Sequence, residues 1–378
     1  MKLVENLISD NIKNLKPCVH GGEVLDAAAK SGLKREEILD FSSSVNPLGP
    51  SKKALEAAQR GFMEIPAYPD TNSTALRQAV ASHFSGITEN NVVVGNGSTE
   101  LMYLFAEAFL RKGEVALIPA PTFGEYESAV RKTGESAKFV KLDANFNVDK
   151  EAVIREMVGA KIVFLCNPNN PTSILIPNQT LTNIIEKAMD QDTLVFLDED
   201  FLEFVENEKT LSLISKIQRY PNLFILRSFT KIFGLTGLRV GYGIASEEII
   251  GVLSCAKIPW NVNCLAQVAA VAALKDDEHL RVTREMIKKE KGLLLVDLEK
   301  FSGFKVYPAD ANFFFIDIRN SGFTANELAS KLLKQGILIR DCTSFRGLDG
   351  YFIRVAVKTH SENERLIEAL KRTVTNQQ

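Results

Sequence analysis

The sequence predicts an α/β protein, with a mostly parallel central sheet in a large domain and a second, smaller α+β domain. From about residue 90, short apolar runs alternate with helix-like segments, and most of these runs are apolar throughout, as in strands covered on both faces. After Pro259 the pattern changes to long helical stretches followed by a separate group of strands. The length of 378 residues suits one catalytic unit of two domains.

The predicted elements follow this pattern in order. A strand at 92–95 leads through Gly97 and Ser98 into an apolar helix that ends near Leu110. Further strands of the large domain are expected at 115–119, 161–166, 193–198, 222–228 and 240–245. In the small domain we expect helical sequence at 264–303, strands at 313–318, 336–341 and 351–357, and a helix at 325–333. A last helix starts at Ser361, which forms a capping box with Glu364. The expected units are an N-terminal segment joining the small domain (1–48), a large domain (49–275) and a small domain (276–378).

Composition excludes several classes of function. Lys and Arg number 45 against 47 Asp and Glu, and this balance gives no reason to expect nucleic acid or an anionic membrane as partner. The five cysteines form no CxxC pair, which favours a reducing, cytoplasmic setting. The four histidines show no metal-ligand spacing, so no metal is expected. No apolar run reaches the length of a membrane span, and none resembles a signal sequence.

The segment Ser228-Phe-Thr-Lys231 follows the end of a predicted strand, where open α/β sheets bind ligands. A lysine amine can form an imine with an aldehyde cofactor, while Ser228, Thr230 and Arg239 can hold a phosphate on it. The alternative is a surface lysine in a loop. Glycines at 234, 237, 241 and 243 argue against a plain helix surface.

Two further turns carry polar groups that could bind such a cofactor. Gly97, Ser98 and Thr99 open a helix, and its first backbone N–H groups can bind an anion; a capped turn without a ligand explains them about as well. Asn170 precedes Pro171 and is held extended, so that its amide could hydrogen-bond a phenolate oxygen of the cofactor. A simple turn is the alternative for Asn170.

Asp198 ends the next strand in the sequence. A carboxylate at this point can pair with a pyridine nitrogen and keep it protonated. The alternative, a solvated acidic loop, remains plausible for the two following residues, Glu199 and Asp200. It fits Asp198 less well, because Asp198 directly follows the apolar run 195–197.

These segments, in the order Gly-Ser-Thr, Asn-Pro, Asp and Ser-x-x-Lys, resemble the fold-type-I (class I/II) aminotransferases over essentially the whole chain. The resemblance implies a pyridoxal 5'-phosphate cofactor, with Lys231 and Asp198 as catalytic residues. Lys231 would bind the cofactor aldehyde, Asp198 the pyridine nitrogen and Asn170 the O3′ atom, while Phe123 stacks on the ring. It assigns the cofactor phosphate to Gly97, Ser98, Thr99, Ser228, Thr230 and Arg239.

Two departures and one intersubunit residue follow from the same resemblance. The family usually reads Asp-Glu-Ala-Tyr, with the tyrosine bonding O3′; Phe201 stands at that position in the cofactor site, leaving O3′ one donor fewer. Ser173 replaces the usual glycine after Asn-Pro-Thr. Tyr68 resembles the tyrosine that reaches the phosphate of a neighbouring subunit, which implies a homodimer.

Within the family, Pro259-Trp-Asn-Val-Asn263 is similar to the branch of histidinol-phosphate aminotransferases and threonine-phosphate decarboxylases. His20-Gly21-Gly22, ahead of Asn46, and the segment around Arg340 resemble the decarboxylases of cobalamin biosynthesis. This implies decarboxylation of L-threonine O-3-phosphate, or of L-serine O-phosphate, with histidinol-phosphate or related amino-acid transamination as the alternative. The substrate-binding candidates are His20, Gly21, Asn46, Asn170, Arg340 and Arg354.

The roles of these candidates carry their own alternatives. Arg354 matches the arginine that holds the α-carboxylate, and Arg340 and His20 are candidates for the substrate phosphate. Arg340 could instead form a surface ion pair with Asp341, and His20 could be structural. A function of another class, the sensor domain of a regulator, is disfavoured because no helix-turn-helix extension or basic arm is present in the sequence.

Overall fold

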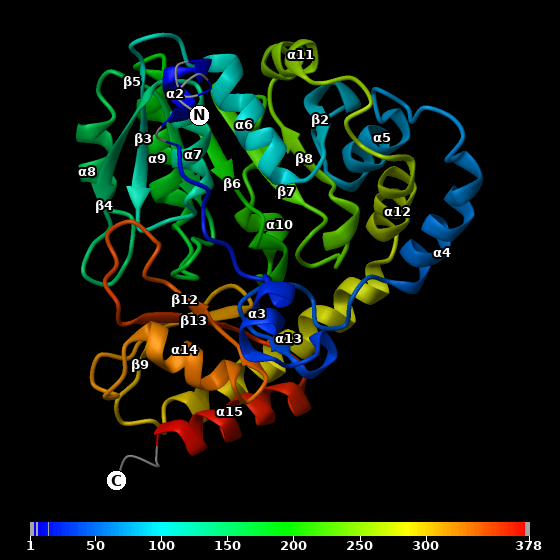
Figure 1. The fold of residues 1–378 in the computed structure, drawn as a ribbon. Coiled ribbons are helices and arrows are strands. Elements are labelled where there is room, and N and C mark those ends of the chain that lie inside the picture. Colours follow the sequence, from blue (N-terminus) through cyan, green and yellow to red (C-terminus); the bar gives the residue numbers. More distant parts are fainter. Residues whose placement is uncertain (1–3, 5–6, 14, 375–378) are drawn as a thin grey trace.

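The computed structural model describes residues 4, 7–13 and 15–374 of the chain, and its largest element is a seven-stranded sheet (Figure 1). The strand order is β2-β8-β7-β6-β5-β3-β4, in which β8 is antiparallel to both neighbours and every other adjacent pair is parallel. The mostly parallel α/β sheet predicted from the apolar runs is therefore confirmed. Its strands are β2 (Val92–Gly95), β3 (Val115–Ala120), β4 (Ser136–Lys141), β5 (Ala160–Cys166), β6 (Leu194–Asp198), β7 (Leu223–Ser228) and β8 (Gly241–Ile244).

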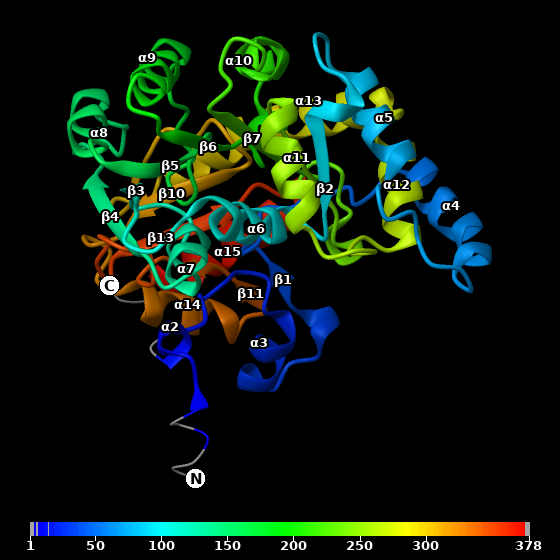
Figure 2. The same ribbon diagram turned by 90° about the horizontal axis from the view of Figure 1, so that it is seen from above.

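Helices cover both faces of this sheet, which explains why its strands are apolar throughout. Alternate residues of one strand enter different cores: Ile162 and Phe164 pack with α6, α7 and α11, whereas Val163 and Leu165 pack with α8 and α9. These helices are α6 (Ser98–Phe109), α7 (Glu125–Lys132), α8 (Lys150–Glu156), α9 (Asn178–Met189) and α11 (Glu247–Ala256). Figure 2 shows the two layers of helices on opposite sides of the strands.

The C-terminal part of the chain forms a smaller α+β unit below the large sheet (Figure 1). Its four-stranded sheet has the order β12-β13-β10-β9, and α14 (Ala325–Leu333) and α15 (His360–Val374) pack together beside it. The strands are β9 (Lys305–Val306), β10 (Phe313–Asp317), β12 (Arg340–Asp341) and β13 (Phe352–Ala356). A separate pair joins β1 (Leu39–Asp40) to β11 (Ile337–Leu338), so the N-terminal segment lies against the C-terminal unit.

Three sequence expectations for this unit were wrong in detail. The strand expected at 336–341 is two short strands in different sheets. The helical stretch at 264–303 is divided into α12 (Cys264–Leu274) and α13 (Asp277–Leu298). The last helix begins at His360, and Thr359, not Ser361, bonds through its N–H and hydroxyl to the carboxylate three residues later, Glu362.

In the part of the chain that the structure describes, the remaining elements are five further helices and single 3₁₀ turns. The helices are α2 (Asp10–Lys13), α3 (Val24–Ser31), α4 (Lys52–Gly61), α5 (Thr74–His83) and α10 (Glu208–Leu211). The 3₁₀ turns are η1 (Arg35–Glu37), η2 (Phe62–Glu64), η3 (Glu89–Asn91), η4 (Leu202–Phe204), η5 (Ile214–Lys216) and η6 (Thr236–Leu238). Within the described residues, no helix is both long and apolar enough to cross a bilayer, and no group of three or more His, Cys, Asp or Glu could hold a metal ion.

Candidate active site

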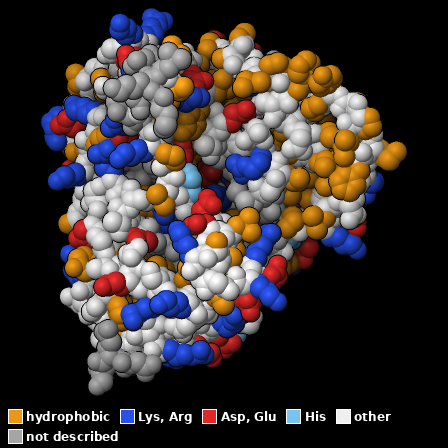
Figure 3. All heavy atoms as spheres, in the orientation of Figure 1, with side chains coloured by type: hydrophobic (Ala, Val, Ile, Leu, Met, Phe, Trp, Pro, Cys, Tyr) orange, Lys and Arg blue, Asp and Glu red, His pale blue; other side chains and the backbone are white. Residues whose placement is uncertain are grey.

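A cavity of about 1370 Å³ lies at the carboxyl ends of the parallel strands, where the N-terminal segment and the C-terminal unit meet the large sheet. Figure 3 shows this hollow near the middle of the face, with a histidine and acidic side chains inside it. Of the predicted site residues, twelve line it: His20, Gly21, Ser98, Thr99, Phe123, Asn170, Phe201, Thr230, Lys231, Arg239, Arg340 and Arg354. Five do not: Asn46, Tyr68, Gly97, Asp198 and Ser228.

Lys231 follows β7 by three residues and faces the cavity, as expected of a reactive amine at a strand end. Its Nζ lies 5.1 Å from the ring centroid of Phe201. Burial lowers the pKa of Lys231; the Asp200 carboxylate opposes this shift, and the Arg354 guanidinium adds to it. A lowered pKa makes the free amine, which is the nucleophilic form, more accessible.

Asp198 is the last residue of β6 and lies behind the cavity wall, 3% exposed. The Tyr126 hydroxyl donates to its Oδ2 at 2.6 Å, and the backbone N–H of Asp200 donates to its Oδ1 at 2.9 Å. Burial raises the pKa of Asp198, the neighbouring Asp200 raises it further, and the Tyr126 bond opposes both. A cation placed against this carboxylate would stabilise its ionised form.

The idea that Glu199 and Asp200 form a solvated acidic loop is wrong. Glu199 is fully buried, and both Nε and Nη2 of Arg227 contact its Oε2, at 2.9 and 2.7 Å. Asp200 is 7% exposed, lines the cavity and accepts a 2.8 Å hydrogen bond from the Ser98 hydroxyl. The cavity therefore contains a carboxylate that sequence reasoning did not assign to it.

The expected phosphate cradle is only partly assembled from the residues named for it. Ser98 begins α6 and, with Thr99, brings the first turn of this helix to the cavity. Gly97 has φ +85°, and a Cβ there would lie 2.3 Å from Nη2 of Arg239, so only glycine allows the guanidinium this close. Arg239 Nη1 donates to the carbonyl of Thr236 at 3.1 Å.

Ser228 does not reach this cradle. It is fully buried, and its hydroxyl accepts the backbone N–H of Thr230 at 2.9 Å. The same local bond orients Thr230, which does line the cavity. Ser228 thus shapes the turn before Lys231, and its predicted contact with the phosphate has no support in the geometry.

Asn170 and Arg354 meet directly at the cavity wall. Arg354 Nη1 donates to Oδ1 of Asn170 and Nη2 donates to the carbonyl of Ser42 at 2.6 Å, while its buried Nε has no partner among the described residues. Because Oδ1 of Asn170 is taken as an acceptor, its amide nitrogen is left as a donor. Burial lowers the pKa of Arg354 to about 10, which still leaves the guanidinium cationic at neutral pH.

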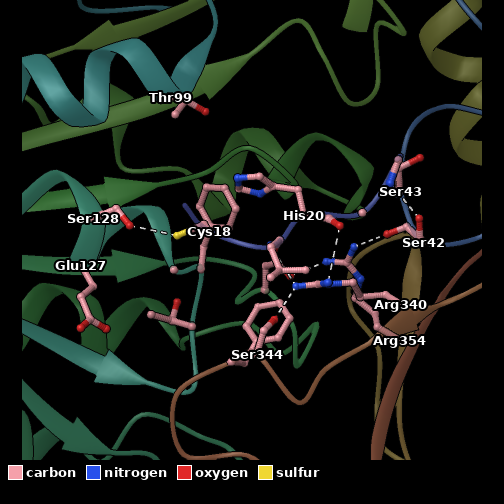
Figure 4. Close-up of a pocket in the computed structure, with 18 of the residues that line it drawn as sticks. Cys18, His20, Ser42, Ser43, Thr99, Glu127, Ser128, Arg340, Ser344 and Arg354 are labelled. Carbon is pink, nitrogen blue, oxygen red and sulfur yellow. Dashed lines mark hydrogen bonds between the residues drawn. The ribbon is translucent and has the colours of Figure 1, made fainter. Parts of the chain in front are cut away.

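Arg340 points from β12 towards the N-terminal segment and does not pair with Asp341 (Figure 4). Its Nη2 donates to the carbonyl of Val19 at 2.7 Å and to the Ser344 hydroxyl at 2.8 Å, and the residue is 7% exposed. The alternative of a surface ion pair is therefore wrong. Arg340 and Arg354 are register partners on β12 and β13, and Figure 4 shows their side chains next to one another.

His20 lies on the N-terminal segment that covers the cavity. Its Nε2 is 2.8 Å from Oε1 of Glu125, whose Oε2 accepts the Tyr103 hydroxyl at 2.6 Å. Its ring centroid is 5.9 Å from that of Phe123. Glu125 thus holds the His20 imidazole next to Phe123, the ring expected to stack on the cofactor. The motif His20-Gly21-Gly22 gave no indication of Glu125 as a partner.

Asn46 and Tyr68 lie outside the cavity. The Asn46 amide nitrogen donates to the carbonyl of Ile232 at 2.8 Å and to the Thr283 hydroxyl at 3.0 Å. Its backbone N–H donates to the carbonyl of Lys231. It supports the lysine segment from behind, contrary to the expected substrate contact. Tyr68 is 80% exposed and stacks on Trp260 at 4.7 Å.

Sequence reasoning missed Tyr126, Glu125 and Asp200. Tyr126 and Glu125 lie on α7, directly after the Phe123 motif, where a hydroxyl and a carboxylate on an amphipathic helix look like ordinary core and surface residues. The signal that could have been used for Asp200 was its place in Asp-Glu-Asp-Phe, where the family usually has alanine.

Comparisons with known proteins agree with this geometry. The family described as aminotransferase class I and II matches residues 36–370. A histidinol-phosphate aminotransferase of Methanothermobacter thermautotrophicus is 37% identical, over 96% of both chains. A protein of Caldanaerobacter subterraneus subsp. tengcongensis, provisionally named threonine-phosphate decarboxylase, is also 37% identical, over 95% of both chains.

Solved structures give the same pair of names. The histidinol-phosphate aminotransferase from Clostridium acetobutylicum superposes with a TM-score of 0.84 at 33% identity, covering 90% of this chain and 100% of that one. The L-threonine-O-3-phosphate decarboxylase from Porphyromonas gingivalis gives a TM-score of 0.79 at 28% identity, covering 89% and 99%.

The fold and the site therefore define a pyridoxal-phosphate-dependent enzyme of fold type I. The chain belongs to the class I and II aminotransferase family. The residues present fit the cofactor: a buried carboxylate lies at the end of β6, an amine follows β7, and the start of α6 and Arg239 form a cationic cradle that glycine alone permits.

Proposed function

We propose that this enzyme decarboxylates L-threonine O-3-phosphate, or its close analogue L-serine O-phosphate, to the aminoalkyl phosphate used in the cobamide nucleotide loop. The observation that carries the proposal is the pairing of Arg340 with Arg354. They are directly opposite residues of adjacent antiparallel strands, both are buried, and both line the cavity that contains Lys231. Directly opposed residues project from the same face of a sheet.

Two neighbouring guanidinium groups favour a small substrate that carries two anions close together. L-threonine O-3-phosphate has its carboxylate and its phosphate on adjacent carbon atoms. Histidinol phosphate carries a phosphate and no carboxylate, so it would offer an anion to only one of the two guanidinium groups. In the proposed complex Arg354 holds the carboxylate, and Arg340 with His20 holds the phosphate.

Pyridoxal phosphate, when bound, withdraws electrons from the substrate Cα, so that a bond at this carbon can break. Arg354 and Arg340 fix the substrate about Cα, and this orientation decides whether the carboxylate or the hydrogen is aligned for loss. The carboxylate leaves as CO2 and its bonding electrons remain at Cα. Lys231 then donates a proton to Cα as the general acid. Asp198 supplies the negative charge that balances the protonated ring nitrogen.

Histidinol-phosphate transamination is the second candidate, because several of the similar proteins carry that name. Identity does not separate the two activities, since relatives of each name are 37% identical to this chain. Both reactions need the lysine, the aspartate and a phosphate site. They differ in whether the phosphorylated substrate itself presents a carboxylate to Arg354; in the transamination that carboxylate would come from glutamate or 2-oxoglutarate.

The deciding experiment compares two substrate sets with one enzyme preparation. L-threonine O-3-phosphate is followed by release of CO2 and of the amine product, and histidinol phosphate with 2-oxoglutarate is followed by formation of glutamate. CO2 release at a useful rate supports the proposal. Glutamate formation without CO2 release rejects it in favour of the aminotransferase.

Lys231 is tested independently of substrate. The purified protein should be yellow, and borohydride should bleach the colour while fixing the cofactor to the peptide that contains Lys231. Lys231→Ala should lose the fixed adduct. An adduct on another lysine would show that the assignment of Lys231 is wrong.

The assembly that we propose is a cytoplasmic homodimer. Phe62, Met63, Ile65 and Ile258 are exposed by 55–83% and lie close in sequence to the stacked pair of Tyr68 and Trp260. Figure 3 shows apolar side chains gathered over α4, and we call this region the apolar face. Such a patch is typical of a protein interface. The loop of Tyr68 is held to this face by Lys257 and Gln267, which donate to the carbonyls of Thr71 and Asp70.

A further inference from the structure

Asp200 is a second carboxylate at the cofactor site that the proposed function does not use. It lines the cavity beside Lys231 and is 7% exposed. Its Oδ2 accepts the Ser98 hydroxyl at 2.8 Å, whereas its Oδ1 is buried without a hydrogen-bond partner among the described residues. The usual family pattern Asp-Glu-Ala-Tyr has alanine at the position of Asp200.

The four charged residues that face Lys231 come from three parts of the fold. Asp198 and Asp200 lie at the end of β6, Arg354 on β13 and Arg239 after η6. Burial lowers the pKa of Lys231 most; among the charges, Asp200 has the largest effect, followed by Arg354, Asp198 and Arg239.

Within the described residues, one carboxylate oxygen of Asp200, Oδ1, accepts no hydrogen bond. Burial raises the pKa of Asp200, and Lys231, the Ser98 hydroxyl, Arg239 and Arg227 lower it, in that order. Asp198 is tied to Tyr126 and to the backbone N–H of Asp200, so both of its oxygen atoms already accept a hydrogen bond. Asp200 Oδ1, which has no partner among the described residues, can therefore accept a hydrogen bond from the Lys231 nitrogen. Each Asp198 oxygen can still accept a further bond, so Asp198 stays available to the pyridine nitrogen.

We propose that Asp200 is a positioning residue that acts through Lys231, by holding a proton on the Lys231 nitrogen when the cofactor is bound. A carboxylate in a buried site favours the cationic form of a neighbouring nitrogen. Phe201 strengthens the same tendency, because it offers the cofactor O3′ no hydroxyl that would favour proton loss. This inference rests on the assignment of Lys231 as the cofactor lysine.

The test is a pH titration of the visible absorbance of the cofactor-loaded protein, which reports the proton on the nitrogen that joins Lys231 to the cofactor. Asp200→Asn keeps an acceptor for Ser98 and removes only the charge. Asp200→Ala introduces the residue that is usual in the family at this position. Asp26→Asn is the matched control, because Asp26 pairs with Lys30 on the exposed surface of α3.

The titration midpoint should move to lower pH in both Asp200 variants and stay unchanged in Asp26→Asn. A midpoint that is lower by one on the pH scale means that the ratio of protonated to neutral nitrogen at a given pH has fallen about tenfold. A midpoint that stays at the wild-type pH in Asp200→Asn and Asp200→Ala overturns the inference. Borohydride fixation followed by peptide mapping separates the two failures, because an adduct on another lysine refutes the assignment of Lys231 and with it the inference drawn for Asp200.

Discussion

The ionised form of the Asp198 carboxylate is poorly stabilised by the protein without its cofactor. Burial and the adjacent Asp200 raise its pKa, and the Tyr126 hydroxyl is the strongest group on the opposing side. A carboxylate in this position gains most from a cation placed against it, and the protonated pyridine nitrogen of the cofactor is such a cation. The proposed role of Asp198 thus follows from its burial as well as from its position at the end of β6.

Asp198→Ala should lower kcat by about 100-fold or more while the far-ultraviolet circular dichroism stays native, because the electron-withdrawing form of the cofactor loses its partner. Tyr126→Phe is a graded companion variant. It removes one hydrogen bond at 2.6 Å and keeps the buried ring, so its loss should be smaller. A kcat near the wild-type value in Asp198→Ala would mean that the electrostatic role lies elsewhere.

At the scale of residues, the sequence predicts strand ends well and hydrogen-bond partners poorly. Lys231, Asn170 and Thr230 reach the cavity because each follows a strand of the parallel sheet, a feature visible in the apolar runs. Asn46 does not, since its amide is taken by residues of α13 and the lysine loop that are more than 180 positions away. Such partners depend on tertiary packing, which no local pattern encodes.

At the scale of elements, the register of β12 and β13 sets the substrate site. Arg340→Ala should weaken kcat/KM for L-threonine O-3-phosphate by roughly 10- to 150-fold, because a charge-assisted hydrogen bond contributes about 1.5–3 kcal/mol. The loss for L-threonine should be much smaller. Ser344→Ala is the control, as it removes a neutral partner of Arg340 and leaves the charge. Equal losses on both substrates would show that Arg340 holds the N-terminal segment through Val19 and does not bind the phosphate.

A buried cluster behind the sheet gives a second prediction at this scale. Arg227, on β7, faces Glu199, Glu203 and Glu208, and three carboxylates share this one fully buried cation. Burial raises the pKa of Glu203 and Arg227 offsets this rise only in part, which leaves the pKa at about 8. Because the folded pKa lies above the ordinary value, the stabilising contribution of Glu203 is complete below its ordinary pKa and is lost as the pH rises through about 8.

The thermal midpoint of the wild-type protein should therefore fall by roughly a few degrees between pH 7 and 9. Glu203→Gln should flatten this fall, since the amide imitates the protonated carboxyl group. Glu206→Gln is the matched control, because Glu206 is exposed and pairs with Lys288 on the surface. The same pH dependence in Glu203→Gln and in the wild type would contradict a titrating Glu203.

The sequence misplaced two elements of the sheets, each for its own physical reason. The stretch 336–341 is apolar enough for one strand, yet Ile339 separates two-residue strands that pair with different partners, β1 and β13. The edge strand β4 was missed because its burial alternates and half of its residues are polar. The central strands β5, β6 and β7 were predicted to within one residue at each end, because burial on both faces gives each of them a continuous apolar run.

At the scale of the whole molecule, the segment between α4 and α5 belongs to the apolar face. Tyr68 lies on this segment, does not line the cavity of its own chain, stacks on Trp260 and is 80% exposed. An isolated subunit would expose this ring and its apolar neighbours to water. A second copy would cover them, and could bring each Tyr68 to the cofactor phosphate of its partner.

Met63→Glu, which places a charge on a side chain that is 83% exposed within this face, should shift the protein from dimer to monomer in size-exclusion chromatography with light scattering. Val158→Glu is the matched control, because Val158 is 69% exposed in the turn after α8, away from the apolar face. Tyr68→Phe should keep the dimer and weaken cofactor binding by roughly 10-fold, the effect of losing one hydrogen bond to a charged group. A dimer that survives Met63→Glu would place the interface elsewhere. If Tyr68→Phe binds the cofactor as tightly as the wild type, the proposed contact of Tyr68 with the partner's cofactor phosphate is wrong, whereas that result does not count against the dimer itself.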